Sequence, residues 1–264
     1  MNLKLISAIL LIFCGSAVAQ PHRIISLTPS ITEQLYLLGE GEKVIGITNF
    51  CRKIYPYQEI VGTYLQPNIE KIVLLKPDIV IVSKEGIQKE IVQKIKQFDI
   101  ETLVLDPVDS YEQLKEQFIT LSKIFNKKDV AEKIISDYEK KYFKSPKKKF
   151  RAVCVLGIEP LIVASDISYI GEIISFSGLE NPVKLKVKYP QINIEELLKW
   201  DPEVIIAADT GISGEKRIKK YFEKYKQLSA VKNNRILILD ANMLYQPTIK
   251  NFWLSVEAIK EKMK

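Results

Sequence analysis

The chain has 264 residues, of which 47% are hydrophobic and 27% charged, a composition that is typical of a globular protein and excludes a disordered or fibrous one. Lysine and arginine outnumber aspartate and glutamate by 39 to 32, so the formal net charge is +7. The lysines are scattered and alternate with glutamates, as in Glu139-Lys140-Lys141. We therefore interpret the basic balance as a solvated surface and expect no nucleic-acid partner.

The beginning of the chain has the pattern of a secretory signal. Lys4 supplies a positive start, residues 5–13 form an apolar run, and residues 17–19 (AVA) are a cleavage pattern of small residues. We expect residues 1–19 to be a signal peptide that is cut after Ala19, which makes the mature protein periplasmic. The apolar run is too short to span a bilayer as a mature helix, and no later segment is long enough to do so.

The three cysteines leave two questions open. Cys14 raises the alternative of a lipidated N-terminus, but Phe13 stands where such a site has a small residue, so we expect no lipid anchor. The mature chain keeps Cys51 and Cys154. In an exported protein these two can form a disulfide between the two halves of the chain, or remain a free loop thiol and a buried strand thiol.

The first half of the chain alternates between predicted strands and helices, which is typical of a parallel sheet covered by helices. Ser30 and Glu33 have the spacing of a capping box, Gly39 ends the helix that they open, and Asn68 caps a later one. The predicted strands are 23–27, 44–48, 78–82 and 101–105, and the predicted helices are 30–39, 68–75 and 86–97.

Two consecutive helical patterns, at 110–126 and 128–143, interrupt this alternation and lead into the lysine-rich residues 144–149. The alternation then resumes with strands at 151–156, 203–207 and 234–239 and helices at 169–177, 193–199, 214–226 and 247–262. The sequence predicts an α/β fold of two Rossmann-like lobes with parallel sheets, joined by one long helix. We expect the first lobe at 20–126, the connecting helix and linker at 127–149, and the second lobe at 150–264.

An internal repeat relates the two halves. Residues 64–81 (YLQPNIEKIVLLKPDIVI) and 189–206 (YPQINIEELLKWDPEVII) share seven identities in eighteen positions without a gap, which indicates two lobes built alike. In each copy an asparagine caps a helix, a glutamate follows at the second helical position, and a tyrosine precedes the cap on the loop. The glutamates, Glu70 and Glu195, complement the helix dipole by about 0.3–1 kcal/mol each. Either that is their whole role, or they form an outward pair that contacts a partner.

Four stretches carry a resemblance to the periplasmic cobalamin- and siderophore-binding proteins of ABC importers, a class with a rigid helix between its lobes. They are residues 23–39, 44–56, 61–82 and 189–206, and the pattern NIEKI-x-x-LKPD-x-x-I at 68–81 is a hallmark of the class. The resemblance covers essentially all of the mature chain. It implies a monomeric protein that captures a small-molecule solute without catalysis and delivers it to a membrane permease, with Glu70 and Glu195 docking onto permease arginines.

The same resemblance implies a ligand-binding cleft. Tyr64 and Tyr189 align with cleft aromatics, and Phe50 or Cys51 falls where an aromatic of the first-lobe rim stands. The cobalamin binder has tryptophans where this chain has the two tyrosines. It also has an arginine near the last helix, where this chain offers Tyr245, Gln246 and Lys250.

The residue types leave three kinds of ligand open. A corrin is a broad, partly apolar plate rimmed by amides, and aromatic faces with glutamines suit it; the candidates are Tyr64, Gln66, Tyr189, Gln191, Tyr245 and Gln246. An anionic ferric siderophore would use cations, for which the candidates are Arg52, Lys53, Lys188 and Lys250. Haem needs an axial ligand, which a tyrosine can supply.

Other classes of protein fit the sequence poorly. The single histidine, His22, lies at the mature N-terminus, which disfavours a zinc or manganese site, a chelatase-like enzyme and a Ser-His-Asp hydrolase. No Gly-rich dinucleotide or phosphate loop occurs. We therefore predict a binding protein that has no catalytic residues, no metal ligands and no cofactor.

Overall fold

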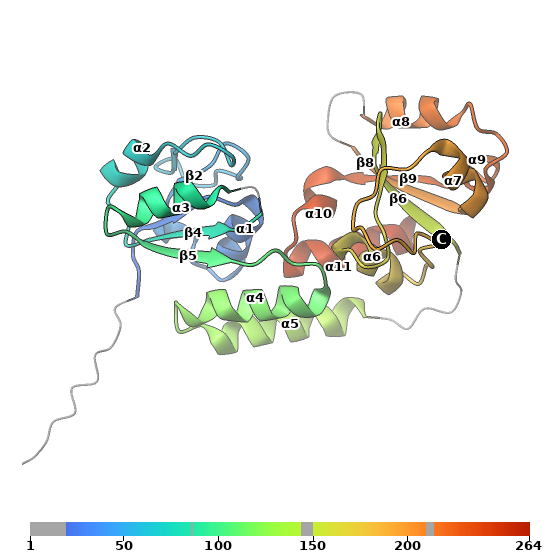
Figure 1. The fold of residues 1–264 in the computed structure, drawn as a ribbon. Helices are drawn as coiled ribbons and strands as arrows, with labels where there is room; N and C mark the ends of the chain where they lie inside the picture. Colours follow the sequence, from blue (N-terminus) through green and yellow to red (C-terminus); the bar gives the residue numbers. More distant parts are fainter. Residues whose placement is uncertain (1–19, 86, 144–149, 210–213) are drawn as a thin grey trace, which may run out of the picture.

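The computed structural model describes residues 20–85, 87–143, 150–209 and 214–264, which form two α/β lobes above a pair of antiparallel helices (Figure 1). The predicted signal peptide and the lysine-rich linker at 144–149 lie outside the described residues. Within these ranges no helix is long and apolar enough to cross a bilayer. The prediction of two α/β lobes is confirmed.

The first lobe is built on a five-stranded parallel sheet. Its strands are β1 (Ile24–Ser26), β2 (Val44–Ile47), β3 (Glu59–Ile60), β4 (Ile79–Ser83) and β5 (Glu101–Leu105), in the order β3-β2-β1-β4-β5. The central strands are apolar and buried on both faces, as parallel strands covered by helices must be. Its helices are α1 (Pro29–Leu37), η1 (Gly41–Lys43), α2 (Ile69–Leu74) and α3 (Lys89–Lys96).

The second lobe repeats the plan with a smaller sheet. Its strands are β6 (Ala152–Ile158), β7 (Leu161–Val163), β8 (Val204–Asp209) and β9 (Ile236–Asp240), in the order β7-β6-β8-β9. The sheet is parallel except for the short edge strand β7, which the sequence did not indicate and which pairs antiparallel with β6. Its helices are α6 (Tyr169–Phe176), α7 (Ile194–Trp200), α8 (Gly214–Phe222), α9 (Ser229–Lys232), α10 (Ala241–Tyr245) and α11 (Ile249–Lys262).

Along the chain, a helical hairpin of α4 (Tyr111–Lys123) and α5 (Lys128–Tyr142) follows the last strand of the first sheet and precedes the first strand of the second. The long helix predicted at 128–143 is present as α5, and it packs along α4 rather than standing alone. Figure 1 shows the hairpin lying under both lobes, with α4 entered from β5 of the first lobe and α5 leading toward β6 of the second. The hairpin therefore joins the lobes as a two-helix unit.

The start of α1 differs from its prediction. The capping box expected at Ser30 is wrong, because the helix begins at Pro29 with Thr28 as its N-cap and no side-chain cap. Proline suits the first helical position because its missing N–H would have no partner there. Thr32 Oγ1 lies 2.8 Å from Ser26 Oγ and 3.1 Å from the Thr28 carbonyl oxygen, so the residue inside the expected box fixes the helix to β1 instead.

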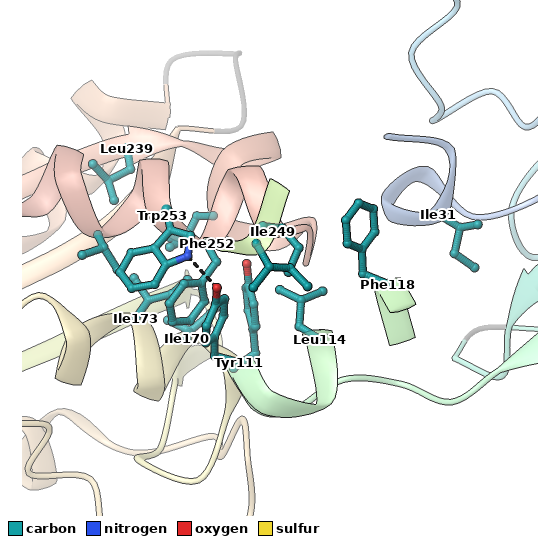
Figure 2. Packing of buried hydrophobic residues seen from close by; sticks show 14 of the residues in the cluster. Ile31, Tyr111, Leu114, Phe118, Ile170, Ile173, Leu239, Ile249, Phe252 and Trp253 are labelled. Carbon is teal, nitrogen blue, oxygen red and sulfur yellow. Dashed lines mark hydrogen bonds between the residues drawn. The ribbon is translucent and has the colours of Figure 1, made fainter. Parts of the chain in front are cut away.

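One apolar core runs through the hairpin and into both lobes (Figure 2). Phe118 of α4 and Ile31 of α1 belong to it on the first-lobe side, and α4 meets the second lobe through Tyr111. There the indole Nε1–H of Trp253 donates a 2.8 Å hydrogen bond to the Tyr111 hydroxyl, and the Phe252 ring stacks on the Tyr111 ring at 4.5 Å. This aromatic joint fixes α4 to α11.

Polar contacts fix the other end of the hairpin to the first lobe. Glu40 is only 2% exposed, and its carboxylate pairs with Lys127 at 2.5 Å and Lys43 at 2.8 Å. Lys127, between α4 and α5, also donates to the Leu38 carbonyl oxygen at 2.9 Å. The hairpin is thus attached to the first lobe at its turn and to the second lobe at its open end.

We expect the Tyr111→Phe substitution to lower the free energy of unfolding by about 1–2 kcal/mol, because the buried Trp253 N–H loses its acceptor. The loss is measured by urea denaturation of residues 20–264. Tyr57→Phe is the matched control, because the Tyr57 ring is 49% exposed and its hydroxyl bonds only at the surface, to the Glu42 carbonyl oxygen. It should change stability by less than about 0.5 kcal/mol. Equal stability of the two variants would contradict the proposed joint.

Candidate functional site

A hollow of about 370 Å³ opens between the lobes, at the carboxyl ends of the first-lobe strands. Ligands of open parallel sheets bind at this edge. Thr28 and Ser83 contribute from the ends of β1 and β4, Gln117 contributes from α4, and the second lobe contributes the segment after α10. The full lining is Thr28, Pro29, Ser30, Phe50, Tyr64, Ser83, Glu85, Pro107, Val108, Gln117, Tyr245, Gln246 and Pro247.

A second hollow of about 460 Å³ adjoins the first and shares Phe50 and Gln246 with it. It lies between the loop after β2 and the α10–α11 region of the second lobe. The two hollows are therefore parts of one groove between the lobes. The lining of the second hollow is Glu33, Phe50, Cys51, Arg52, Asp240, Asn242, Met243, Gln246, Lys250, Asn251 and Leu254.

Tyr64 and Tyr189 reach the interlobe space from opposite lobes. Burial, together with the smaller effect of the negative charge of Glu85, raises the pKa of each phenol to about 12. Both tyrosines must lie near Glu85 for its charge to act on them. Tyr189 is 39% exposed and is not among the residues that line either hollow.

Tyr245 lines the first hollow, but its hydroxyl is enclosed by the protein and does not open onto the hollow. Its Oη is buried, and within the described part of the chain it has no hydrogen-bond partner. Burial raises the pKa of this phenol, which keeps it a neutral donor. A buried hydroxyl without a partner costs about 1–3 kcal/mol, so this position is unfavourable for the stability of the protein.

Cys51 and Arg52 form the wall of the second hollow in different ways. The Cys51 thiol is 7% exposed and lies 3.2 Å from both the Thr32 and Thr48 hydroxyls, and burial raises its pKa. The Arg52 guanidinium forms a two-pronged ion pair with Glu33 at 2.7 and 2.8 Å. Cys51 and Cys154 are both free and buried, so the disulfide alternative is not realised.

The structure brings together most of the predicted ligand-binding residues. Phe50, Tyr64, Tyr245 and Gln246 line the first hollow, and Cys51 and Lys250 line the second. Tyr189 lines neither hollow. Gln66 is exposed and lines neither hollow; its N–H donates to the Thr63 hydroxyl in its own turn.

Several residues that line the hollows were not predicted as site residues, among them Glu85 and Gln117. Glu85 follows the predicted strand at 78–82 closely enough that its place at the carboxyl edge of the sheet was available as a signal. Gln117 lies inside a helix pattern, and only the packing of α4 brings it to the hollow. Its Nε2–H donates to the Asp106 carbonyl oxygen at 2.7 Å, which orients the amide.

The repeated glutamates occupy the same position in both lobes, at the second residue of α2 and of α7. Asn68 and Asn193 cap these helices as predicted, each accepting one backbone N–H. In α7 the capping box is completed by Glu196, so Glu195 is not needed for it. Glu70 and Glu195 are both exposed, and α2 and α7 lie on different lobes (Figure 1).

Comparison with known proteins adds to this geometry. The vitamin B12-binding protein of Vibrio cholerae serotype O1 is 28% identical to this chain over 264 residues, covering 93% of this chain and 92% of that protein. The crystal structure of the periplasmic vitamin B12-binding protein of Vibrio cholerae is similar with a TM-score of 0.72 at 25% identity, covering 93% and 99% of the two chains. The periplasmic haem-binding protein of the same organism gives a TM-score of 0.77 at 17% identity, covering 92% and 99%, which shows a shared fold.

A family model described as periplasmic binding protein matches residues 24–243. That span contains both sheets, the helical hairpin and most of the residues that line the interlobe groove, although the lining residues from Tyr245 onward lie beyond it. The chain therefore belongs to the periplasmic binding protein family.

Proposed function

We propose that this protein captures a corrinoid between its two lobes and delivers it to the permease of an ABC importer. The observation that carries the proposal is the interlobe groove, in which aromatic rings and amides from both lobes surround one space. The full-length similarity to vitamin B12-binding proteins supports the choice of a corrinoid.

The groove has the chemistry that such a ligand requires. A corrin presents a broad apolar face, and large apolar pockets with a few placed polar groups bind such ligands. Phe50 is 68% exposed, an unfavourable arrangement for a phenylalanine unless something covers it. Tyr64 and Tyr245 offer further rings, while Gln117 and Gln246 offer amides that can pair with the peripheral amides of the corrin.

The proposed mechanism is capture without a chemical step. The helical hairpin is fixed to both lobes, so closure over the ligand is a small tilt rather than a wide hinge motion. In this proposal residues 1–19 direct the export of the protein, and the mature protein acts as a monomer in the periplasm.

Delivery to the permease is assigned to Glu70 and Glu195. Each is exposed at the start of a helix, one on each lobe, so together they mark two separated points on the surface. Carboxylates at such points suit pairing with arginines of a membrane partner.

An anionic ferric chelate is the second candidate ligand, and the second hollow favours it. Arg52 and Lys250 line that hollow, and cations there would attract carboxylate or hydroxamate oxygens. Glu33 already pairs with Arg52, which leaves Lys250 as the principal cation for this role. The groove as a whole therefore favours the corrinoid.

We expect Tyr64→Ala to weaken the binding of cyanocobalamin about tenfold, because the ring face against the corrin is lost. Tyr189→Ala should act in the same direction, and to a smaller extent because Tyr189 lines neither hollow. The dissociation constants are measured by calorimetric titration of residues 20–264. Tyr57→Ala serves as control, since this exposed tyrosine lies on the same lobe outside both hollows. The corrinoid assignment is wrong if the wild-type protein gives no saturable heat with cyanocobalamin but binds a ferric siderophore or haem.

Reversing the charge of both repeated glutamates, Glu70→Lys with Glu195→Lys, should abolish transport while leaving solute affinity within about twofold. Uptake is followed in cells or in vesicles that contain the importer, and affinity in the isolated protein. The matched control reverses Glu112 and Glu132, which are exposed on the hairpin helices away from α2 and α7 (Figure 1). Normal uptake by the Glu70/Glu195 variant would remove the docking role.

A further inference from the structure

Glu85 carries the charge of the first hollow. It follows β4 on the turn that its own N–H stabilises by donating to the Ser83 hydroxyl at 3.2 Å. Among the described residues that line this hollow, it is the one aspartate, glutamate, lysine or arginine. The space between Tyr64 and Tyr245 is therefore bordered by one carboxylate and otherwise by neutral groups.

Nearby basic side chains are already paired with other acids. Lys84, the neighbour of Glu85, forms its ion pair with Asp106 across the ends of β4 and β5. Lys188, next to Tyr189, pairs with Asp109 at 2.7 Å. Among residues 20–85, 87–143, 150–209 and 214–264, no lysine or arginine forms an ion pair with Glu85. Its negative charge is left to act on whatever enters the groove.

The negative charge of Glu85 acts on tyrosines of both lobes. It contributes to the raised pKa of Tyr64 in the first lobe and of Tyr189 in the second, although burial is the larger cause for each. A solute lodged between these rings would therefore lie within the electrostatic range of the same carboxylate. Glu85 is exposed in this structure, and the interaction strengthens as a bound solute displaces water from around the carboxylate.

We propose that Glu85 is a specificity-determining residue, which accepts hydrogen bonds from a ligand rimmed by primary amides and excludes ligands that present carboxylates at the same place. This inference rests on the proposed function and deepens it, because it names the charge class of the solute. An amide N–H donates to a carboxylate in a charge-assisted hydrogen bond. A ligand carboxylate there meets a like charge, and such repulsion against a competitor is an effective source of selectivity.

The test compares cyanocobalamin with its monocarboxylic derivatives, in which one peripheral propionamide is replaced by a carboxylate of nearly the same shape. Calorimetric titration of the wild-type protein should give a dissociation constant about tenfold weaker for at least one of these acids. Glu85→Gln should reduce that difference to about twofold, mainly through tighter binding of the acid, because glutamine keeps the size and removes the charge. Added salt should narrow the wild-type difference as well, since the repulsion is screened.

Glu90→Gln is the matched control, because Glu90 is an exposed glutamate of α3 that lines neither hollow. It changes the net charge of the protein equally and should leave the wild-type difference intact. If Glu85→Gln discriminates against the acids as strongly as the wild type, Glu85 does not set specificity, although corrinoid binding itself still stands.

Haem carries two propionates, so a haem titration can test the role of Glu85 even if the protein binds no corrinoid. If the wild-type protein binds no corrinoid, that function is wrong, and the role of Glu85 is then read from haem. Tighter haem binding by Glu85→Gln, by about fivefold, would support the exclusion of anionic ligands. Unchanged haem binding would overturn it.

Discussion

The buried ion pair between Glu40 and Lys127 holds the turn of the helical hairpin against the first lobe, and the rest of the molecule depends on it. Glu40 is almost fully buried, so loss of Lys127 would leave a carboxylate with only Lys43 to compensate it. Removing one partner of a buried pair is far more costly than the net stabilisation that the pair provides. At the other end of α4, the hydrogen bond from Trp253 to Tyr111 lies within an aromatic cluster and holds the helix against the second lobe. The distance between these two joints is set by a helix of 13 residues, about 20 Å long.

Because this distance is fixed, the two walls of the groove can move only a little relative to each other. A groove whose walls move little must have its chemistry in place before the solute arrives, which lowers the ordering cost of binding. Two features of the walls fit this requirement: the Phe50 ring is exposed, and the Glu85 carboxylate forms no ion pair within the described structure. The exposed ring is unfavourable in the empty protein and becomes favourable once an apolar plate covers it. The repeated glutamates lie outside this groove, so the proposed solute capture and the proposed partner docking involve separate surfaces.

Much of the fold could be predicted because its signals are local. Buried β-branched runs such as Ile79–Ser83 indicate parallel strands, and Asn68 and Asn193 cap the helices that they precede. Local signals failed at Ser30, where a proline one residue earlier competed for the helix start, and at the short β7 and α10. The site was predicted in part because the repeat placed Tyr64 and Tyr189 at equivalent points. Gln117 and the pairing of Glu40 with Lys127 depend on contacts between segments far apart in sequence, which no local pattern encodes.

A crystal structure of residues 20–264 with cyanocobalamin tests the central claim most directly. The account predicts one corrin in the groove, with Tyr64 and Tyr245 against it, Tyr189 at its edge, a peripheral amide within hydrogen-bond distance of Glu85, and both joints of the hairpin unchanged. A corrinoid bound outside the groove, or lobes swung apart with the contacts of Lys127 or Tyr111 broken, would contradict it.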